Sequence, residues 1–195
     1  MIEASGGKPL LPRKWTELSA MTISYGHGLS TSPLHLAAGY AALANGGYQV
    51  NPTLIRKEQP TLGPRIISEN AAKASVVMLR KVVTQGTAKR YGDVPGYAVA
   101  GKTGTSEKLK KNGGGYDKER VLASFASVFP AHDPQYVLVV AMDEAVETVG
   151  LKPRRTASLT AVPVAAEIIG RVAPLLGMRP HFEPQVLTNV ELTAN

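Results

Sequence analysis

Apolar residues follow helical spacing in three stretches of the chain. The first stretch begins near Ser32, which can cap a helix, and ends at Asn45-Gly46-Gly47. The second begins at Ser68 and ends near Gln85-Gly86, and the third begins near Thr160. Each is predicted to be a helix that buries one face, because residues three and four positions apart lie on the same side of a helix. The predicted buried residues are Leu34, Ala37, Ala38 and Ala41 in the first helix, Ala72, Val76, Leu79 and Val83 in the second, and Val162, Ala165, Ala166, Ile169, Val172 and Ala173 in the third.

Three other stretches have the composition of strands. Tyr97-Ala98-Val99-Ala100 leads into Lys102 with β-branched and aromatic residues. Val121–Phe129 and Tyr136–Met142 are apolar on both faces, which indicates that other layers cover the sheet on each side. The turn between them, Pro130–Gln135, is short, so these two strands are predicted to be antiparallel. The pattern therefore predicts an α/β fold in which an antiparallel sheet is covered by helices.

The remaining long segments lack a regular pattern. Glu17–Ser24 is ambiguous, and we expect a short turn there. Glu144–Leu159 is predicted to be irregular, and the polar, proline-rich segment after Gly177 is predicted to be poorly ordered. The chain is therefore expected to form one folded unit over residues 1–178 and to end in a polar, disordered tail over residues 179–195.

Length and composition limit the classes of protein that fit. The 195 residues, 44% of them hydrophobic, can supply the core of one domain or of a large part of one. Cysteine is absent, which excludes disulfides and thiolate metal sites, and no metal or other cofactor is expected. No apolar run reaches the roughly 18 residues of a membrane span, and the first residues lack the charged-then-apolar pattern of a signal peptide. We therefore expect no export signal or membrane anchor within this sequence.

The net charge of +7 includes one dense basic cluster after the centre of the chain. The cluster consists of Lys108, Lys110, Lys111, Lys118 and Arg120. A solvated loop is the favoured interpretation, and attraction to an anionic surface is the alternative. No helical nucleic-acid module or aromatic-plus-basic RNA signature accompanies the charge, so nucleic acid is not an expected partner.

Lys102-Thr103-Gly104-Thr105 is the stretch with the clearest chemistry. Lys102 can attract an anion, and the hydroxyls of Thr103 and Thr105 can donate hydrogen bonds to a carboxylate. Gly104 has no side chain, so another backbone can approach closely, as a peptide added alongside a strand requires. These residues are therefore predicted to form a recognition edge for a peptide that ends in a carboxylate.

The same residues also match a phosphate-binding loop. Residues Gly96–Thr103 satisfy the pattern G-x-x-x-x-G-K-[ST], and Asp143 after a later apolar run would be its magnesium ligand. Such a loop follows a strand and opens a helix at its Lys-Thr. Here Gly92-Asp93-Val94-Pro95 is turn material, and Asn112-Gly113-Gly114-Gly115 leaves too little room for a helix after Gly104. The nucleotide-binding interpretation is therefore the weaker one, and a strand through Lys102 would exclude it.

Several stretches, taken in order, resemble the C-terminal half of a class B penicillin-binding protein transpeptidase domain of the septal, cell-division type. The resemblance covers roughly residues 10–178, and its specificity lies in the joint order of the pieces. The matching pieces are Ser24-Tyr25-Gly26-His27-Gly28-Leu29-Ser30, Ser32-Pro33-Leu34, Ala41-Ala42-Leu43-Ala44-Asn45-Gly46-Gly47, Val82-Val83-Thr84-Gln85-Gly86-Thr87-Ala88, Val99-Ala100-Gly101-Lys102-Thr103-Gly104-Thr105, Ala123-Ser124-Phe125, Phe129-Pro130-Ala131 and Val137 to Glu144.

The resemblance implies a penicillin-binding-protein/β-lactamase-like fold and a D,D-transpeptidase that cross-links peptidoglycan stem peptides and is acylated by β-lactams. Lys102, Thr103 and Thr105 would bind the terminal carboxylate of the peptide, and the Thr105 N–H would form half of an oxyanion hole. The resemblance also implies a place at the periplasmic face of the bacterial inner membrane and partners in the division machinery.

The nucleophile of that family is not expected in this chain. Transpeptidases of the family use a Ser-x-x-Lys and a Ser-x-Asn, both well upstream of the Tyr-Gly-x-Gly segment. Ser5-Gly6-Gly7-Lys8 and Ser68-Glu69-Asn70 match those spacings, but the first is too rich in glycine for a helix and Ser68 is needed as a helix cap. We therefore expect a fragment that is inactive alone and lacks the N-terminal half of its domain. A non-catalytic module that binds peptide or cell-wall polymer is the remaining alternative.

Overall fold

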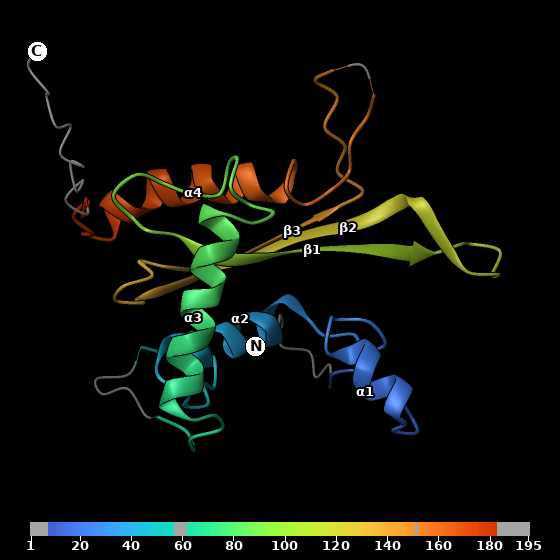
Figure 1. Cartoon of the computed structure of the whole chain (residues 1–195), viewed down its shortest axis with the longest axis horizontal. Coiled ribbons are helices and arrows are strands. Elements are labelled where there is room, and N and C mark those ends of the chain that lie inside the picture. Colours follow the sequence, from blue (N-terminus) through green and yellow to red (C-terminus); the bar gives the residue numbers. More distant parts are fainter. Residues whose placement is uncertain (1–7, 57–61, 151, 183–195) are drawn as a thin grey trace, which may run out of the picture.

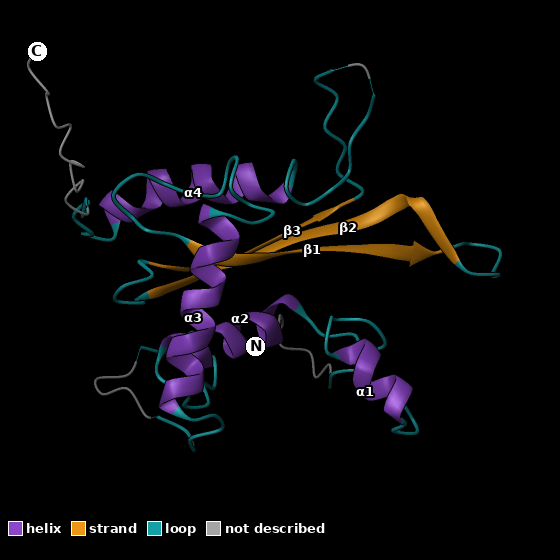
Figure 2. Cartoon of the chain, in the orientation of Figure 1, coloured by secondary structure: helices purple, strands orange, loops and turns teal. Residues whose placement is uncertain are grey.

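The computed structural model describes residues 8–56, 62–150 and 152–182 (Figure 1). Within this part of the chain, three strands form one sheet and four helices lie around it (Figure 2). In chain order the elements are α1 (Glu17–Ile23), α2 (Pro33–Ala44), α3 (Glu69–Thr84), β1 (Ala100–Leu109), β2 (Tyr116–Phe129), β3 (Tyr136–Asp143) and α4 (Ala161–Leu175). This arrangement confirms the predicted α/β fold.

The sheet has the strand order β1-β2-β3, and both neighbouring pairs are antiparallel. Lys102 on β1 lies opposite Ala126, and Tyr136 at the start of β3 lies opposite Phe129. The predicted antiparallel pairing across the turn that precedes Tyr136 is thus confirmed. Among the described strands β1 pairs only with β2, so its other edge can pair with an extended peptide.

Helices cover both faces of the sheet, as the apolar pattern of β2 and β3 predicts. Helix α4 lies on one side of the sheet and α2 on the other (Figure 1). The larger cluster of buried residues lies between the sheet and α4 and includes Phe125 and Ile169. A smaller cluster on the opposite face includes Val128 of β2 and Val76 of α3, with α2 beside it. Helix α3 contributes Val83 to the larger cluster as well, so it passes from one side of the sheet to the other next to β1.

The predicted buried faces of α3 and α4 are largely confirmed. Seven of the ten predicted residues are buried, namely Ala72, Val76, Val83, Val162, Ala165, Ile169 and Ala173. The other three, Leu79, Ala166 and Val172, are half-buried. These helices therefore supply the packing that fixes β1 and β2 in place.

Helix α2 begins as predicted but lacks the burial that its composition requires. The Ser32 hydroxyl accepts a hydrogen bond from the His35 N–H at 3.3 Å, and Pro33 is the first helical residue. The helix is apolar on nearly every side, yet Ala42 is its one buried residue. The predicted inward residues, Leu34, Ala37, Ala38 and Ala41, are all half-buried. A helix that is apolar all round is normally enclosed by protein, so α2 has the composition of a helix with a further packing partner.

The predicted turn over Glu17–Ser24 is wrong, because this segment forms α1. The Thr16 hydroxyl accepts a hydrogen bond from the Ser19 N–H at 3.1 Å, which is a side-chain cap that the sequence pattern did not reveal. None of the seven residues of α1 is buried. The helix has only seven residues, which is too short a stretch for the apolar spacing of a helix to be recognised in the sequence.

The strand that carries the Lys-Thr-Gly sequence begins later than predicted. Tyr97 lies in a turn, and Ala98 has a φ of 42°, which no strand residue adopts. The strand therefore begins at Ala100 rather than at Tyr97. Tyr97 and Val99 are nevertheless buried, so their β-like composition reflects packing in the core rather than strand pairing.

The predicted basic loop is instead the distal part of a long β-hairpin. Strand β1 continues to Leu109, and β2 begins at Tyr116 rather than at Val121. The chain reverses at three glycines, Gly113-Gly114-Gly115, with φ values of 75°, 82° and 111°. Lys108, Lys118 and Arg120 of the basic cluster therefore lie in strands, and Lys110 and Lys111 lie at the tip.

Glu144 ties the two arms of this hairpin to the end of β3. Its carboxylate oxygen accepts hydrogen bonds from Lys108 Nζ and from Arg120 Nε, each at 2.9 Å, and Lys108 also pairs with Asp143. Hydrogen bonds from Lys108 and Arg120 hold the pKa of the Glu144 carboxyl below its usual value, and the Asp143 and Glu144 carboxylates raise the pKa of the Lys108 ammonium.

We expect Glu144→Gln to lower the melting temperature at pH 7. Because the pKa of Glu144 is lowered by folding, its ionised form stabilises the fold above the unfolded pKa of 4.5, and this contribution is lost as the pH falls through the folded pKa. The difference in melting temperature between the chain and the variant should therefore shrink below pH 4.5. Glu107→Gln is the matched control, because Glu107 has no ion pair among the described residues. A difference for Glu144→Gln that stays constant from about pH 7 to about pH 3 would contradict this role.

Three predictions for the chain ends and loops concern residues that are only partly described. The end of the predicted disordered tail, residues 183–195, and the start of the Ser5-to-Lys8 match lie outside the described residues. At the beginning of the tail, the His181 N–H donates to the Gly96 carbonyl at 2.8 Å. The predicted irregular segment Glu144–Leu159 is described except for residue 151, and Glu147 and Arg154 form an isolated bridge within it.

Candidate functional site

The Lys-Thr-Gly-Thr sequence lies on the edge strand β1, two residues after its start. Side chains alternate between the faces of a strand, so Thr103 and Thr105 share one face and Lys102 lies on the other. Thr103 and Thr105 pair with Phe125 and Ala123, which belong to the cluster on the α4 side. The exposed Lys102 side chain bends back along the strand, and its Nζ donates to the Thr103 carbonyl at 2.9 Å. The two hydroxyls therefore share the face on the α4 side, and the Lys102 ammonium lies beside the backbone of Thr103.

Each of the two threonine hydroxyls has a protein partner from another part of the chain. Thr103 Oγ1 lies 2.9 Å from the Thr87 hydroxyl, in the loop after α3. Thr105 Oγ1 accepts a hydrogen bond from the Ala157 N–H at 3.1 Å, just before α4. The α4 side of the strand is thus bordered by segments that contact both hydroxyls.

Two glycines of β1 lie against close neighbours on β2. A Cβ at Gly104 would lie 2.7 Å from the Ser124 hydroxyl oxygen, and a Cβ at Gly101 would lie 2.6 Å from the ring of Phe125. The sequence-based interpretation assigned Gly104 to the approach of another backbone. The structure adds a second reason, because Ser124 already occupies the space beside it and donates to its carbonyl at 3.4 Å.

The phosphate-loop interpretation is excluded by the same strand. Lys102 and Thr103 lie within β1, whereas a phosphate loop needs a helix that opens at these residues. Asp143, the proposed magnesium ligand, pairs with Lys108. Within the described residues, the pattern match from Gly96 to Thr103 is therefore a coincidence of spacing.

The Ser68-Glu69-Asn70 match to a Ser-x-Asn motif is explained by helix capping, as predicted. The Ser68 hydroxyl accepts a hydrogen bond from the Ala71 N–H at 3.2 Å and begins α3. A serine in this role is fully accounted for by local structure. The Ser5 match cannot be placed, since residues 1–7 lie outside the described part of the chain.

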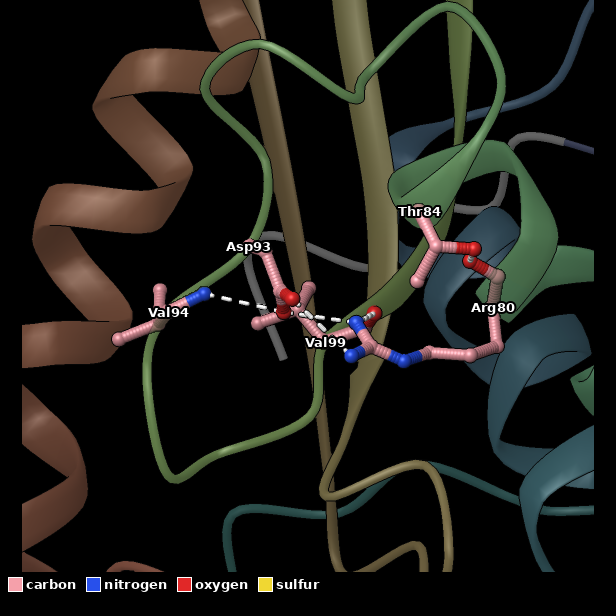
Figure 3. A network of polar contacts seen from close by, with 5 residues as sticks. All are labelled: Arg80, Thr84, Asp93, Val94 and Val99. Atoms are coloured by element: carbon pink, nitrogen blue, oxygen red, sulfur yellow. Dashed lines mark hydrogen bonds and ion pairs between the residues drawn. The ribbon is translucent and has the colours of Figure 1, made fainter. Parts of the chain in front are cut away.

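Arg80 on α3 fixes the entry to the site strand, and sequence reasoning did not identify it. Its guanidinium donates to both carboxylate oxygens of Asp93, at 2.6 and 3.0 Å, and to the Val99 carbonyl at 2.8 Å (Figure 3). Val99 immediately precedes β1, and the neighbouring Ala98 carbonyl accepts from the Ala131 N–H at 2.7 Å. These bonds hold the positive φ of Ala98 in place. The partners are 13 and 19 residues from Arg80, so no local pattern signals them.

We expect Arg80→Met to lower the free energy of unfolding by about 1–2 kcal/mol in urea denaturation. The ion pair is partly solvated, which limits its contribution, but the variant also removes the partner of the buried Val99 carbonyl. Arg171→Met is the matched control, because its ion pair with Glu167 is a solvated pair within one helix. Its effect should stay within about 0.5 kcal/mol. Equal effects for the two variants would contradict a role for Arg80 in holding the strand.

Comparison with known proteins places this site in a protein family. The family model of the penicillin-binding protein transpeptidase domain matches residues 2–170. The probable peptidoglycan D,D-transpeptidase FtsI of Caulobacter vibrioides is 36% identical over 191 residues, which cover 93% of this chain and 32% of that protein. Peptidoglycan D,D-transpeptidase FtsI of Escherichia coli K12 is 29% identical over 186 residues, which cover 95% of this chain and 30% of that protein.

Solved structures show the same similarity. The transpeptidase domain of Burkholderia pseudomallei penicillin-binding protein 3 superposes with a TM-score of 0.76 at 34% identity, over 87% of this chain and 50% of that one. Penicillin-binding protein 3 of Mycobacterium tuberculosis in complex with ampicillin superposes with a TM-score of 0.73 at 27% identity, over 94% of this chain and 44% of that one.

The chain spans about a third of the length of these curated relatives and about half of the solved domain from Burkholderia pseudomallei. No helix in residues 8–56, 62–150 or 152–182 has the length and apolar content to cross a membrane. The family match extends over most of the chain, from its second residue to α4, and includes the whole sheet. The chain therefore belongs to the penicillin-binding protein transpeptidase domain family.

Proposed function

We propose that this chain forms the substrate-binding half of a peptidoglycan D,D-transpeptidase domain. In this proposal Lys102, Thr103 and Thr105 bind the terminal carboxylate of a stem peptide, or the carboxylate of a β-lactam. The observation that carries the proposal is the position of these residues on an edge strand, with one cation and two hydroxyls along it. Charged hydrogen bonds of this kind are the strong ones, and the free edge allows an extended peptide to lie beside the strand.

The chemical role of the strand is to hold and polarise the peptide for acyl transfer. The nucleophile of the family is a serine that attacks the penultimate D-alanine carbonyl, and the terminal D-alanine leaves. In this proposal the N–H of Thr105, on the same strand, forms half of an oxyanion hole, and the N–H of the nucleophile supplies the other half. Lys102 adds positive charge where the carboxylate binds. No metal or cofactor has a part in this proposal.

We further propose that the nucleophile belongs to a second half of the domain that packs on the side of α1 and α2. Helix α2 is apolar all round but has one buried residue. Large apolar side chains on α1 and in the segment before it are exposed, among them Leu10, Leu11, Trp15, Leu18 and Met21. The solved domain of the family is about twice as long as the part that this chain covers. Exposed apolar surface of this extent is typical of an interface. Because the proposal places the nucleophile in the second half, the chain alone should not turn over substrate.

The cellular setting is proposed from the relatives. Two of them are named as FtsI peptidoglycan D,D-transpeptidases. The resemblance to septal transpeptidases implies a place at the periplasmic face of the inner membrane and partners among division proteins. We propose the same location and the same class of partner for the complete domain. A non-catalytic module that binds peptide through the edge of β1 is the second candidate, because that edge is free of any described strand.

Carboxylate binding can be tested directly on this chain by NMR of its threonine methyl groups. We expect N-acetyl-D-alanyl-D-alanine to shift the signals of Thr103 and Thr105, because its carboxylate would contact both hydroxyls. The C-terminal amide of the same dipeptide is the matched control and should leave these signals nearly unchanged. Equal shifts with acid and amide, or no shift at either threonine, would contradict the proposed binding site.

A further inference from the structure

Thr87 contacts the site but lies outside the Lys-Thr-Gly-Thr sequence. Its hydroxyl oxygen is 2.9 Å from that of Thr103, across 16 positions of the sequence. The loop that carries Thr87 is fixed by the packing around it. The Ala88 N–H donates to the Val82 carbonyl at 3.2 Å, Ala88 is buried in the larger core cluster, and a Cβ at Gly86 would lie 2.8 Å from Val82 Cα. Thr87 therefore presents its hydroxyl from a rigid support.

When an anion binds, only one of the two hydroxyls can donate the hydrogen bond that joins them. A threonine hydroxyl has one hydrogen to donate and can accept two hydrogen bonds. If Thr103 donates its hydrogen to a carboxylate, the bond between the two hydroxyls must be donated by Thr87. The Thr103 oxygen is then an acceptor from the protein side, and its hydrogen is directed to the ligand side.

Thr105 is arranged in the same way by a different donor. Its oxygen accepts from the Ala157 N–H at 3.1 Å, so its hydrogen is available for another acceptor. Ala157 is buried, and its carbonyl accepts from the Val162 N–H at 2.9 Å at the start of α4. The Thr105 oxygen thus accepts a hydrogen bond from a fixed donor, and the Thr103 oxygen accepts one from Thr87 when its own hydrogen is donated to the ligand.

We propose that Thr87 is a positioning residue that turns the Thr103 hydroxyl hydrogen toward the carboxylate of the ligand, as the Ala157 N–H does for Thr105. This proposal rests on the proposed function of the strand. A donor that is already oriented does not have to be reoriented when the ligand arrives, so the bond that it makes is worth more to binding. Thr87 thereby extends the anion-binding site to the loop after α3.

The test compares Thr87→Val with Thr87→Ser in the NMR titration with N-acetyl-D-alanyl-D-alanine. Valine has nearly the same shape as threonine but cannot donate, and serine keeps the hydroxyl. Loss of a neutral hydrogen bond of about 1 kcal/mol corresponds to roughly fivefold weaker binding, so we expect about that loss for Thr87→Val. Thr87→Ser should bind within about twofold of the unchanged chain, and the amide dipeptide should not distinguish the variants.

A double-mutant cycle separates orientation of Thr103 from a general structural effect. If Thr87 acts through Thr103, Thr87→Val should have no further effect in a Thr103→Val background but should keep its full effect in a Thr105→Val background. Thr87→Val with unchanged affinity for the acid, or with equal losses in both backgrounds, would overturn the inference and leave the proposed function standing. Absence of any acid-specific shift at Thr103 and Thr105 in the unchanged chain would overturn both.

Discussion

Lys102→Met is expected to reduce binding of N-acetyl-D-alanyl-D-alanine by at least about tenfold. A hydrogen bond to a charged group contributes roughly 1.5–3 kcal/mol, and each 1.4 kcal/mol changes an affinity about tenfold. Methionine keeps the length of the side chain and removes its charge, so the loss reports the cation alone. At the ligand concentration that half-saturates the unchanged chain, occupancy of the variant should therefore fall to about a tenth or less.

Two further variants make this result specific to the site. Lys102→Arg keeps the charge and should lose much less affinity than Lys102→Met. Lys89→Met removes another exposed cation, in the loop after α3, and should leave binding unchanged. Because Lys102 is exposed and its one hydrogen bond is to a neighbouring carbonyl, the melting temperature should change little. Equal losses for Lys102→Met and Lys89→Met would show that net charge, rather than the site, attracts the ligand.

Gly101→Val is expected to lower the free energy of unfolding by about 3 kcal/mol. A Cβ at this position would lie 2.6 Å from Cζ of Phe125 and 2.7 Å from the Ala126 carbonyl oxygen. Neither neighbour can move easily, because the Phe125 ring is fully buried in the larger core cluster and the carbonyl is part of the β2 backbone. The variant must therefore displace β1 or the ring, directly beside Lys102.

Gly39→Ala is expected to have the opposite effect and to raise the free energy of unfolding. Gly39 lies inside α2, and an added Cβ would meet nothing within 4 Å. Alanine at this position should stabilise the chain by up to about 1 kcal/mol, since glycine in a helix costs that much relative to alanine. Both variants can be measured by urea denaturation. A Gly101→Val variant as stable as Gly39→Ala would contradict the close packing between β1 and β2.

Elements with strong local signals could be predicted from the sequence. Ser32 and Ser68 mark the starts of α2 and α3 because each caps its helix with a side-chain hydroxyl, and this signal lies within four residues. The turn between β2 and β3 is short, which leaves no room for a crossover, so their antiparallel pairing also followed from the sequence. The Lys102 motif was recognised because its residues are contiguous.

Features that depend on distant residues could not be predicted. The positive φ of Ala98 is held by Arg80 and Ala131, and nothing near Ala98 in the sequence signals it. The strand therefore began later than its composition suggested. Likewise, the contact of Thr87 with Thr103 depends on how α3 passes the sheet. Such contacts follow from tertiary packing, which local propensity and spacing do not contain.

The length of the hairpin formed by β1 and β2 could not be predicted from the sequence either. Polar and basic residues between Thr105 and Val121 resemble a loop because both arms extend beyond the covered part of the sheet. Their pairing with each other, and the anchoring of Lys108 and Arg120 by Glu144, keep them in strands without burial. Alternation of apolar and polar residues predicts strands only where one face is buried.

The central claim is that this chain supplies the binding strand of a transpeptidase domain whose nucleophile lies on another polypeptide segment. The most direct test is intact-mass spectrometry after incubation with benzylpenicillin. For this test the chain is co-expressed with the upstream half of the Burkholderia pseudomallei domain, because the chain is 34% identical to the part of that domain with which it superposes. We predict a penicilloyl adduct on that upstream half, dependent on Lys102, and none on this chain. An adduct on this chain itself would contradict the claim, because its nucleophile would then lie among these 195 residues.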